Sequence, residues 1–314
     1  MYRKASKPTM YFIGVTTSKS SIMSVFPAWA ESLGLGPCEI KGIDLKLHDE
    51  PEKYREAVTF IKNDPLSLGA LVTTHKIDLL KACRDQFEEL DEYAGLMGEI
   101  SSISKHDGKL VGHAKDPITS GLSLEAFIPE NYWKNSGAEV FILGAGGSAI
   151  AVSWYLMKKE HGENHPSKII IANRSTPRLD EIKHVHSQLD TKVKVEYVHA
   201  SSMDISDKII SGLKPGSLVI NATGMGKDTP GSPISEFAKF PESGFVWDFN
   251  YRGDLIFLDQ ARKQQKERNL NVVDGWVYFI HGWTRVISEV FHVEIPTSGK
   301  RFDKLSELAA RQRK

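Results

Sequence analysis

Lys76 stands at a point of the sequence where a charged side chain is unusual. It follows an apolar, strand-like run, Ala70-Leu71-Val72, and it precedes what reads as a new helix. Burying an ammonium group without a partner costs more free energy than one ordinary contact contributes. Lys76 is therefore either a surface residue at a helix start or a residue with a chemical task.

A glycine-rich loop provides the second chemical signal. The strand-like run FIL leads into Gly144-Ala145-Gly146-Gly147-Ser148-Ala149, and an amphipathic helix follows at once. In this G-x-G-x-x-A pattern Gly144 allows a tight turn, Gly146 lets the backbone approach a pyrophosphate, and Ala149 lets the helix pack closely on the strand. The context predicts dinucleotide binding, and a structural strand–helix turn is the alternative.

The end of the next strand distinguishes between dinucleotides. A site for NAD usually places Asp or Glu there, to accept a hydrogen bond from the ribose hydroxyl. Here the strand runs into Asn173-Arg174-Ser175-Thr176-Pro177-Arg178, with no carboxylate and two guanidinium groups. Since a guanidinium pairs with phosphate oxygens, the sequence favours NADP. The alternative is that Arg174 and Arg178 are only solvated.

The elements that would position these residues alternate between strand and helix. Strand-like runs at 11–17, 38–47 and 69–74 are separated by helical patterns, the first with apolar residues from Ile22 to Leu33 and the second at 51–63. This βαβαβ series predicts a parallel sheet. Residues 99–115, with the turn signal His106-Asp107-Gly108, predict a hairpin, after which a first domain should close near Asp116.

A second βα series begins after a helical stretch. Its predicted strands are 138–146, 167–174, 191–200, 217–223, 244–251 and 271–273. The series predicts a doubly wound sheet. Helical patterns resume from Gly275, and the charged segment 301–314 is predicted to be either a solvated amphipathic helix or an added extension without a function.

The composition excludes several classes of function. The 314 residues favour two domains, and 40 basic residues balance 40 acidic ones, so no nucleic-acid partner is expected. Cys38 and Cys83 lack CxxC spacing, and His184 and His186 lie on different faces of a predicted helix, so no metal site is expected. No apolar run approaches the ~20 residues of a membrane span. A cytoplasmic protein acting on a small molecule, as a monomer or homodimer, is the expectation.

Several short motifs occur in an order that resembles the shikimate dehydrogenase family over most of the chain. They are Ser18-Lys19-Ser20, Thr73-Thr74-His75-Lys76, Asp116, GAGGSA (144–149), NRSTPR (173–178), Asn221-Ala222-Thr223, Asp248-Phe249-Asn250-Tyr251 and Asp274-Gly275. The resemblance implies a two-domain α/β fold. A substrate-binding and catalytic domain is expected at 1–125, a Rossmann-type NADP-binding domain at 126–274, and C-terminal helices at 275–314 that return to the first domain.

The resemblance also implies roles for individual residues. Lys76 and Asp116 correspond to the catalytic pair of the family, and a lysine held in this way can give or take the proton of the reacting hydroxyl. A structural ion pair is the alternative. The implied substrate contacts are Ser18 and Ser20, which would bind a carboxylate, together with Thr73, Tyr251 and Tyr278. The implied cofactor contacts are Gly144, Ala145, Gly146, Gly147, Ser148, Ala149, Asn173, Arg174, Ser175, Arg178, Ala222, Thr223 and Gly275.

The sequence departs from the family at positions that contact the substrate. The segment before Lys76 is one residue shorter than in the family and lacks the family's proline. The family's asparagine before the hairpin is replaced here by Ser101 or Ser102, and the family's glutamine on the last helix is replaced by Gly282. Because hydrogen-bonding sites discriminate strongly, these changes predict an altered substrate. The expected function is NADP-dependent hydride transfer on a shikimate-like cyclic polyol acid. A quinate or other cyclitol dehydrogenase, or a non-catalytic NADP-binding sensor, is the alternative.

Overall fold

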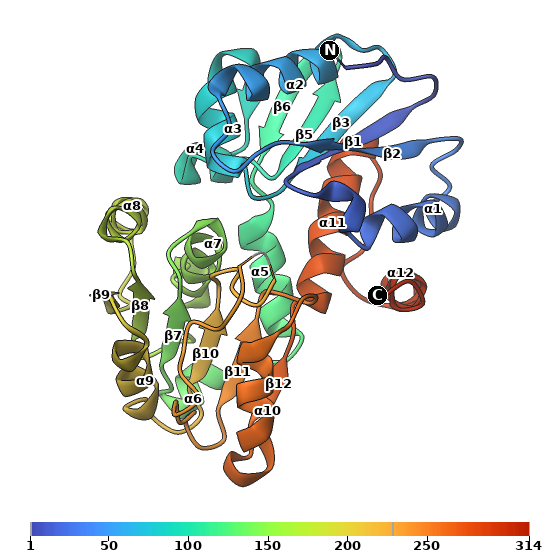
Figure 1. Cartoon of the computed structure of the whole chain (residues 1–314). Coiled ribbons are helices and arrows are strands. Elements are labelled where there is room, and N and C mark those ends of the chain that lie inside the picture. The colour runs from blue at the N-terminus through green and yellow to red at the C-terminus, as the bar shows by residue number, and fades with distance from the viewer. Residues whose placement is uncertain (1, 228, 314) are drawn as a thin grey trace. The chain divides into compact units, whose positions relative to one another are not determined.

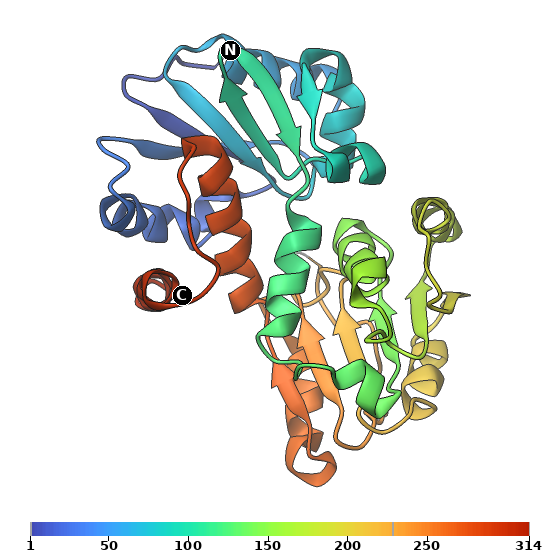
Figure 2. The same cartoon turned by 180° about the vertical axis from the view of Figure 1, so that it is seen from behind.

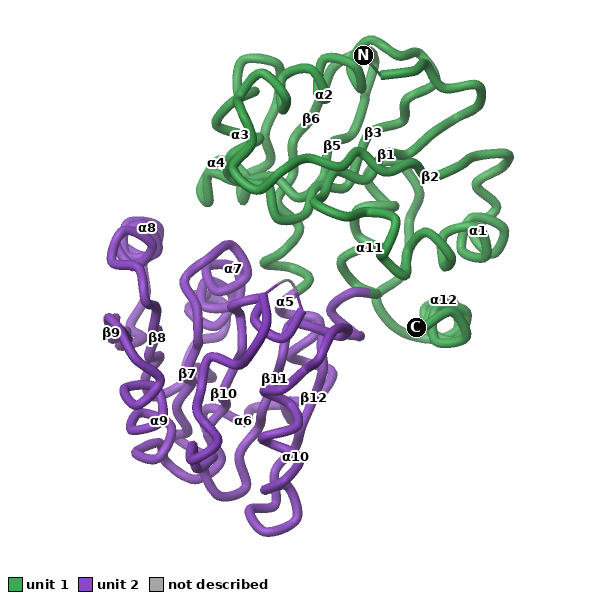
Figure 3. Tube along the Cα trace, in the orientation of Figure 1, with its two compact units in different colours: residues 1–119, 280–314 green, residues 120–279 purple. Residues whose placement is uncertain are grey.

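The computed structural model describes residues 2–227 and 229–313, and the chain divides into two compact units. Unit 1 comprises Met1–Thr119 and Ile280–Lys314, and unit 2 comprises Ser120–Phe279 (Figure 3). Each unit contains a six-stranded sheet. The chain passes from one unit to the other inside helix α5 (Asp116–Glu125) and again inside helix α11 (Trp276–Phe291), so both connections are continuous helices.

The sheet of unit 1 is mixed, with the strand order β2-β1-β3-β5-β6-β4. Its strands are β1 (Thr9–Gly14), β2 (Glu39–Asp44), β3 (Ser67–Val72), β4 (Glu89–Leu90), β5 (Ser102–His106) and β6 (Lys109–His113). β1 pairs in parallel with β2 and β3, whereas β5 pairs antiparallel with both β3 and β6. The predicted parallel series and the predicted hairpin are both confirmed.

Helices pack on both faces of this sheet. They are α1 (Ile22–Leu33), α2 (Pro51–Asn63), α3 (Lys76–Cys83) and α4 (Glu92–Met97), with short 3₁₀ turns η1 (Thr17–Lys19) and η2 (Arg84–Gln86). Tyr11 and Ile13 of β1 belong to the same core cluster as residues of α2 and α3. The intervening Phe12 points to the opposite face, where its ring lies 4.9 Å from that of Trp283 in α11. This alternation is the side-chain pattern of a strand covered on both faces.

The sheet of unit 2 is parallel throughout, in the order β12-β11-β10-β7-β8-β9. Its strands are β7 (Val140–Leu143), β8 (Ile169–Asn173), β9 (Val195–His199), β10 (Leu218–Asn221), β11 (Phe245–Asp248) and β12 (Asn271–Val273). Chain order reverses direction between β7 and β10, the switch point where ligands bind in open α/β sheets. The predicted doubly wound sheet is therefore confirmed.

Helices also cover both faces of the unit 2 sheet. They are α6 (Tyr132–Ser136), α7 (Gly147–Leu156), α8 (Thr176–His186), α9 (Met203–Ser211) and α10 (Ile256–Arg268), with the 3₁₀ turn η3 (Lys159–His161). In Figure 1, α9 and α10 lie in front of the sheet. In Figure 2, which is turned by 180°, α5, α6 and α7 lie in front of the opposite face. β7 and β10 are buried along their whole length, and accordingly β7 is apolar throughout and β10 is apolar up to its last residue, Asn221.

The C-terminal helices complete unit 1. α12 (Lys300–Ala310) packs beside α1, where the indole Nε1 of Trp29 donates to the backbone oxygen of Leu305 at 2.8 Å. Leu305 and Ala309 are fully buried. The prediction of an amphipathic helix is confirmed, but the prediction that it is only solvated is wrong on this face, because α1 supplies an apolar partner. In the part of the chain that the structure describes, no helix is long and apolar enough to cross a bilayer.

Candidate functional site

Lys76 and Asp116 form an ion pair within unit 1. The ammonium group of Lys76 donates to Asp116 Oδ2, and the two side chains are only 16% and 10% exposed. Lys76 is the first residue of α3 and Asp116 the first residue of α5. The strands before these helices, β3 and β6, run in the same direction because each pairs antiparallel with β5. The carboxyl ends of β3 and β6 therefore lie at the same end of the sheet, and both residues follow at that end.

The surroundings of Lys76 favour its charged form. Burial disfavours an ammonium group and lowers the pKa of Lys76, but the negative charges of Asp116 and Glu99 and the hydrogen bond to Asp116 outweigh burial. The pKa of Lys76 is therefore raised above its usual value. At neutral pH the side chain is an ammonium group that can donate a proton or a hydrogen bond.

Glu99 is a second carboxylate that acts on this pair, and no sequence motif points to it. The residue is 1% exposed, and neither of its side-chain oxygens has a hydrogen-bond partner among the described residues. Burial raises the pKa of Glu99 to about 7, while Lys76 acts to lower it and Asp116 to raise it. In the sequence Glu99 precedes an alternating strand pattern, where a polar residue is ordinarily solvent-exposed, so no sequence signal distinguishes it.

Asp116 is held in place by a polar network. The backbone N–H of Lys115 donates to Ser101 Oγ at 2.7 Å, and Lys115 Nζ pairs with Glu289 of α11, also at 2.7 Å. Asp91 Oδ1 accepts from the backbone N–H of Ala114 at 3.1 Å. Ser101, one of the two serines at the expected asparagine position, therefore already uses its hydroxyl to bind the chain next to Asp116.

Two histidines near the pair make contacts that suit a structural role. His75 is 1% exposed, its Nδ1 lies 3.2 Å from the hydroxyl of Tyr54, and burial lowers the pKa of His75. His113 Nε2 lies 2.9 Å from Ser104 Oγ. These contacts fix the chain at the ends of β3 and β6, the strands that precede Lys76 and Asp116.

The predicted substrate contacts of unit 1 lie at the same edge of the sheet. Ser18 is in η1 directly after β1 and is exposed, and Ser20, the residue after η1, is half-buried. Thr73 follows β3, is half-buried, and donates its backbone N–H to Ile13 of β1 at 3.0 Å. Since the carboxyl ends of parallel strands meet at one edge, these residues lie on the side of the sheet from which α3 begins.

The glycine-rich loop of unit 2 has the geometry that its sequence predicts. Gly144 has φ +108°, and a Cβ at that position would lie 2.8 Å from the backbone oxygen of Ala222. A Cβ at Gly146 would meet nothing within 4 Å, so the backbone is open to a ligand there. Helix α7 begins at Gly147, and Ala149 is fully buried against the sheet. Gly147 and Ser148 at the helix start are half-buried, and Ala145 is buried.

The basic segment after β8 is only partly available for a phosphate group. Arg174 is exposed, and Asn173 Nδ2 donates to the backbone oxygen of Ser175 at 3.1 Å, which shapes the turn. Arg178, in contrast, pairs with Glu181 one helical turn later at 2.6 Å. Among these four predicted contacts, Arg174 has the most accessible cation.

Two further loops of unit 2, after β10 and after β12, are held by close contacts. Asn221 Oδ1 accepts from both the backbone N–H and the hydroxyl of Thr223, at 3.1 and 2.7 Å. Ala222 donates its N–H to Leu143, the last residue of β7, at 2.8 Å. A Cβ at Gly275 would lie 2.0 Å from the oxygen of Phe249, so only glycine fits there.

The two predicted tyrosines of unit 2 pack in aromatic clusters. Tyr251 has its ring 5.3 Å from that of Trp276 and 4.8 Å from that of Phe279. The ring of Tyr278 lies 4.7 Å from that of Phe249. Both tyrosines are half-buried.

The paired histidines of α8 are not equivalent. His186 is buried, and its ring nitrogens lie 2.8 Å from Ser153 Oγ and 2.8 Å from the hydroxyl of Tyr197. Burial lowers the pKa of His186 to about 4. His184 is exposed. The described residues contain no group of three or more His, Cys, Asp or Glu that could hold a metal ion.

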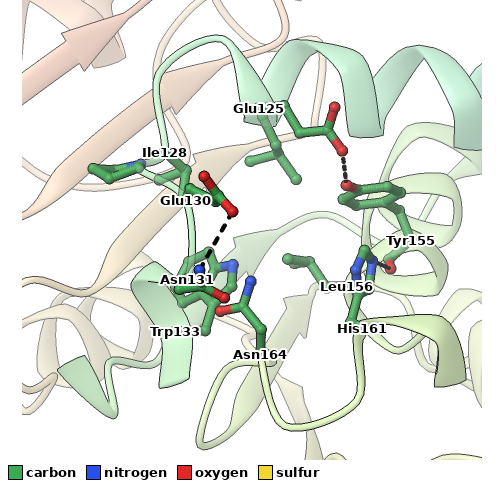
Figure 4. A pocket seen from close by; sticks show the side chains of 11 residues that line it. Glu125, Ile128, Glu130, Asn131, Trp133, Tyr155, Leu156, His161 and Asn164 are labelled. Carbon is green, nitrogen blue, oxygen red and sulfur yellow. Dashed lines mark hydrogen bonds between the residues drawn. The ribbon is translucent and has the colours of Figure 1, made fainter. Parts of the chain in front are cut away.

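A pocket of about 370 Å³ lies in unit 2 near the C-terminal end of α7 (Figure 4). The hydroxyl of Tyr155 donates to Glu125 at 2.5 Å across it, and the ring of Tyr155 packs edge-on against His161. None of the predicted site residues lines this pocket, because the glycine-rich loop precedes the other end of α7. Its lining residues are Leu124, Glu125, Ile128, Pro129, Glu130, Asn131, Trp133, Tyr155, Leu156, His161 and Asn164.

Comparison with known proteins gives a consistent set of relatives, although no protein-family profile matches the chain. A curated shikimate dehydrogenase (NADP(+)) from Lactococcus lactis subsp. cremoris is 26% identical over 237 residues, which are 74% of this chain and 78% of the relative. A protein of the same name from Methanocaldococcus jannaschii is 32% identical over 193 residues, which are 60% of this chain and 61% of the relative.

Solved structures share the fold over nearly the whole chain. Shikimate dehydrogenase from Aquifex aeolicus superimposes with a TM-score of 0.73 at 19% identity and covers 99% of this chain and 100% of its own. Quinate dehydrogenase from Corynebacterium glutamicum, solved with NAD, gives 0.71 at 19% identity over 97% and 99%. The two-domain α/β fold predicted from the resemblance is thereby confirmed. In sequence the chain is similar to curated shikimate dehydrogenases, and in fold it is similar to shikimate and quinate dehydrogenases.

Proposed function

We propose that this chain is an NADP-dependent oxidoreductase that interconverts a secondary alcohol and a ketone on a shikimate-like cyclic polyol acid. The observation that carries the proposal is the buried ion pair of Lys76 and Asp116, each the first residue of a helix at one edge of the unit 1 sheet. The relatives named shikimate dehydrogenase (NADP(+)) supply the class of reaction.

Lys76 is the proposed proton-transfer residue. When an alcohol is oxidised, the hydroxyl proton must leave as the hydride leaves the carbon, and when the ketone is reduced, a proton must be supplied to the oxygen. A raised pKa keeps Lys76 protonated and ready to donate in the direction of reduction. Asp116 holds the ammonium group in place and keeps its charge tolerable in a buried setting. NADP, when bound, accepts or supplies the hydride.

Unit 2 is the proposed NADP-binding domain. The turn at Gly144, the open backbone at Gly146 and the N-terminus of α7 fit a pyrophosphate group. β8 ends at Asn173 and is followed directly by Arg174, with no carboxylate; Arg174 is exposed, which suits a 2′-phosphate. Thr223 and Gly275 are proposed to lie near the nicotinamide, because their loops follow β10 and β12, the two strands that flank β11 in the parallel sheet.

Unit 1 is the proposed substrate domain, with Ser18 and Ser20 as the hydroxyls that bind a carboxylate. Two features support a substrate that differs from shikimate in its hydroxyl groups. The hydroxyl of Ser101 already binds the N–H of Lys115, and Gly282 has no side chain, while a Cβ there would meet only Thr119 at 3.8 Å. A larger or differently substituted ring, such as quinate or another cyclitol, is therefore a second candidate substrate.

The test is a panel of cyclic polyols and polyol acids, assayed with NADP and with NAD and repeated with Lys76→Ala. Turnover of at least one ring substrate with a preference for NADP is expected, and Lys76→Ala should lower that turnover by roughly 10²–10⁴. Lys81→Ala is the matched control, because Lys81 is an exposed lysine of the same helix.

Two outcomes would contradict the proposal. Unchanged turnover in Lys76→Ala would remove Lys76 from the reaction. Tight NADPH binding without turnover of any member of the panel would favour the non-catalytic sensor. Strong turnover of shikimate alone would instead reject only the altered substrate.

A further inference from the structure

Glu99 is a buried acid to which the proposed reaction assigns no role. It lies between α4 and β5, it is 1% exposed, and both of its side-chain oxygens lack hydrogen-bond partners among the described residues. A carboxylate removed from water without compensation is strongly unfavourable, so buried acids are normally paired or hydrogen-bonded. Glu99 therefore needs a nearby cation when it is ionised.

The backbone around Glu99 is bonded to both sides of the proton-transfer pair. The N–H of Ile100, the next residue, donates to the backbone oxygen of Lys76 at 3.3 Å. Ser101 Oγ accepts from the N–H of Lys115, the residue before Asp116, at 2.7 Å. The segment 99–101 thus connects the start of α3 to the start of α5.

The charges that face Glu99 come from these two helices. They are the ammonium group of Lys76 on α3 and the carboxylate of Asp116 on α5. The charged groups of the neighbouring elements are occupied elsewhere, since Lys115 pairs with Glu289 of α11 at 2.7 Å. His113 of β6 contacts Ser104 and lies 3.6 Å from Asp91, the residue before α4. Lys76 is therefore the cation that balances Glu99.

We propose that Glu99 is a positioning residue of the proton-transfer site, a second counter-charge that holds Lys76 in its ammonium form and sets the pH at which Lys76 titrates. This inference rests on the proposed function only for its effect on turnover. The charge coupling between Glu99 and Lys76 is a property of unit 1 itself.

The arrangement has a consequence for the reaction cycle. When Lys76 donates its proton to a substrate oxygen it becomes a neutral amine, and two carboxylates then remain without a cation. That state is disfavoured, so Lys76 recovers a proton from solvent more readily than a lysine paired with one carboxylate. Glu99 contacts neither the substrate nor the cofactor in this scheme, and it acts through Lys76 alone.

The direct test is the titration of Lys76 by NMR, in protein labelled with ¹³C at the lysine Cε carbons. The signal of Lys76 is assigned by its loss in Lys76→Ala. Glu99→Gln keeps the size of the side chain and removes its charge, so the Lys76 titration should move to lower pH. Glu99→Asp restores a carboxylate and should return the titration toward that of the unmodified chain. Glu92→Gln, at an exposed glutamate of α4, is the matched control and should leave it in place.

The same variants are then assayed for NADPH-dependent ketone reduction across pH. The alkaline limb of the rate profile should move to lower pH in Glu99→Gln, because the acid form of Lys76 is lost earlier. A Lys76 titration that is the same in Glu99→Gln and in the unmodified chain would overturn the inference, even if Glu99→Gln melts at a lower temperature. If Lys76→Ala retains full turnover while the NMR shift is present, the proposed function fails and the coupling stands.

Discussion

Replacing Lys76 by methionine should destabilise unit 1 in a manner that depends on pH. Methionine keeps the length and the apolar stem of the side chain but removes the charge, so Asp116 and Glu99 are left buried without a cation. Removing one partner of a buried ion pair typically costs about 3–5 kcal/mol. Asp116→Asn should cost less, because Lys76 still has the carboxylate of Glu99.

The pH dependence follows from Glu99. Its pKa is raised from 4.5 to about 7 in the folded protein, so its contribution to stability is present below pH 4.5 and is lost as the pH rises through 7. This shift is equivalent to about 3 kcal/mol. In Lys76→Met the lowering influence of Lys76 on this pKa is gone. The loss of stability should therefore be largest near pH 8.5 and smaller near pH 5.5, where Glu99 is protonated.

The measurement is calorimetric unfolding of Lys76→Met and of Asp116→Asn, each at about pH 5.5 and about pH 8.5. Hydrogen exchange of the β3 and β5 amides assigns the affected transition to unit 1. Lys81→Met, at an exposed lysine of α3, should change stability by less than about 0.5 kcal/mol. Adding Glu99→Gln to Lys76→Met should recover part of the loss at pH 8.5. A loss in Asp116→Asn as large as that in Lys76→Met, or a loss in Lys76→Met that is the same at both pH values, would refute the reasoning.

Three further predictions concern unit 2. Gly144→Ala should weaken NADPH binding and lower the melting temperature, measured by titration calorimetry and thermal unfolding, because φ is +108° and the new Cβ would lie 2.8 Å from the oxygen of Ala222; unchanged affinity would remove the loop from the cofactor site. Arg174→Ala should raise the dissociation constant for NADP by roughly 10-fold or more while leaving that for NAD nearly unchanged, since a charge-assisted hydrogen bond contributes about 1.5–3 kcal/mol; an equal effect on both would assign the 2′-phosphate contact elsewhere. Burial lowers the pKa of His186 from 6.5 to about 4. The stabilisation that depends on neutral His186 is therefore complete above pH 6.5 and is lost as the pH falls through 4, and this loss is up to about 3 kcal/mol. In His186→Gln the melting temperature should fall less steeply at acid pH than in the unmodified chain. If the melting temperatures of the two proteins fall in parallel with pH, groups other than His186 cause the acid loss.

The sequence predicts best the elements whose own residues determine them. The second helix begins at Pro51 and ends at Asn63 as predicted, because proline suits the first turn and the apolar residues recur at helical spacing. The last strand of unit 2, Asn271–Val273, also matches its predicted bounds. The glycine-rich loop was recognisable because Gly144 must adopt a backbone conformation that other residues rarely adopt.

Features that depend on distant parts of the chain could not be predicted in this way. Glu99 is buried only because the segment after α4 bonds to the start of α3, which no local pattern reveals. Arg178 reads as a phosphate contact, but Glu181 lies one turn further along the same helix and binds its guanidinium group. The two-residue strand β4 is too short to show any alternation.

The two passages of the chain through α5 and α11 have a consequence for synthesis. Unit 1 is discontinuous, so ribosomal synthesis delivers all of unit 2 before the last residues of unit 1 emerge. Until then Phe12 lacks the ring of Trp283, and Trp29 lacks the backbone oxygen of Leu305. Unit 2 can fold as a continuous segment, whereas the nascent unit 1 sheet keeps one apolar face uncovered until residues 280–314 have been synthesised. A chaperone that shields exposed apolar surface should therefore bind nascent chains halted before residue 280 more strongly than completed ones.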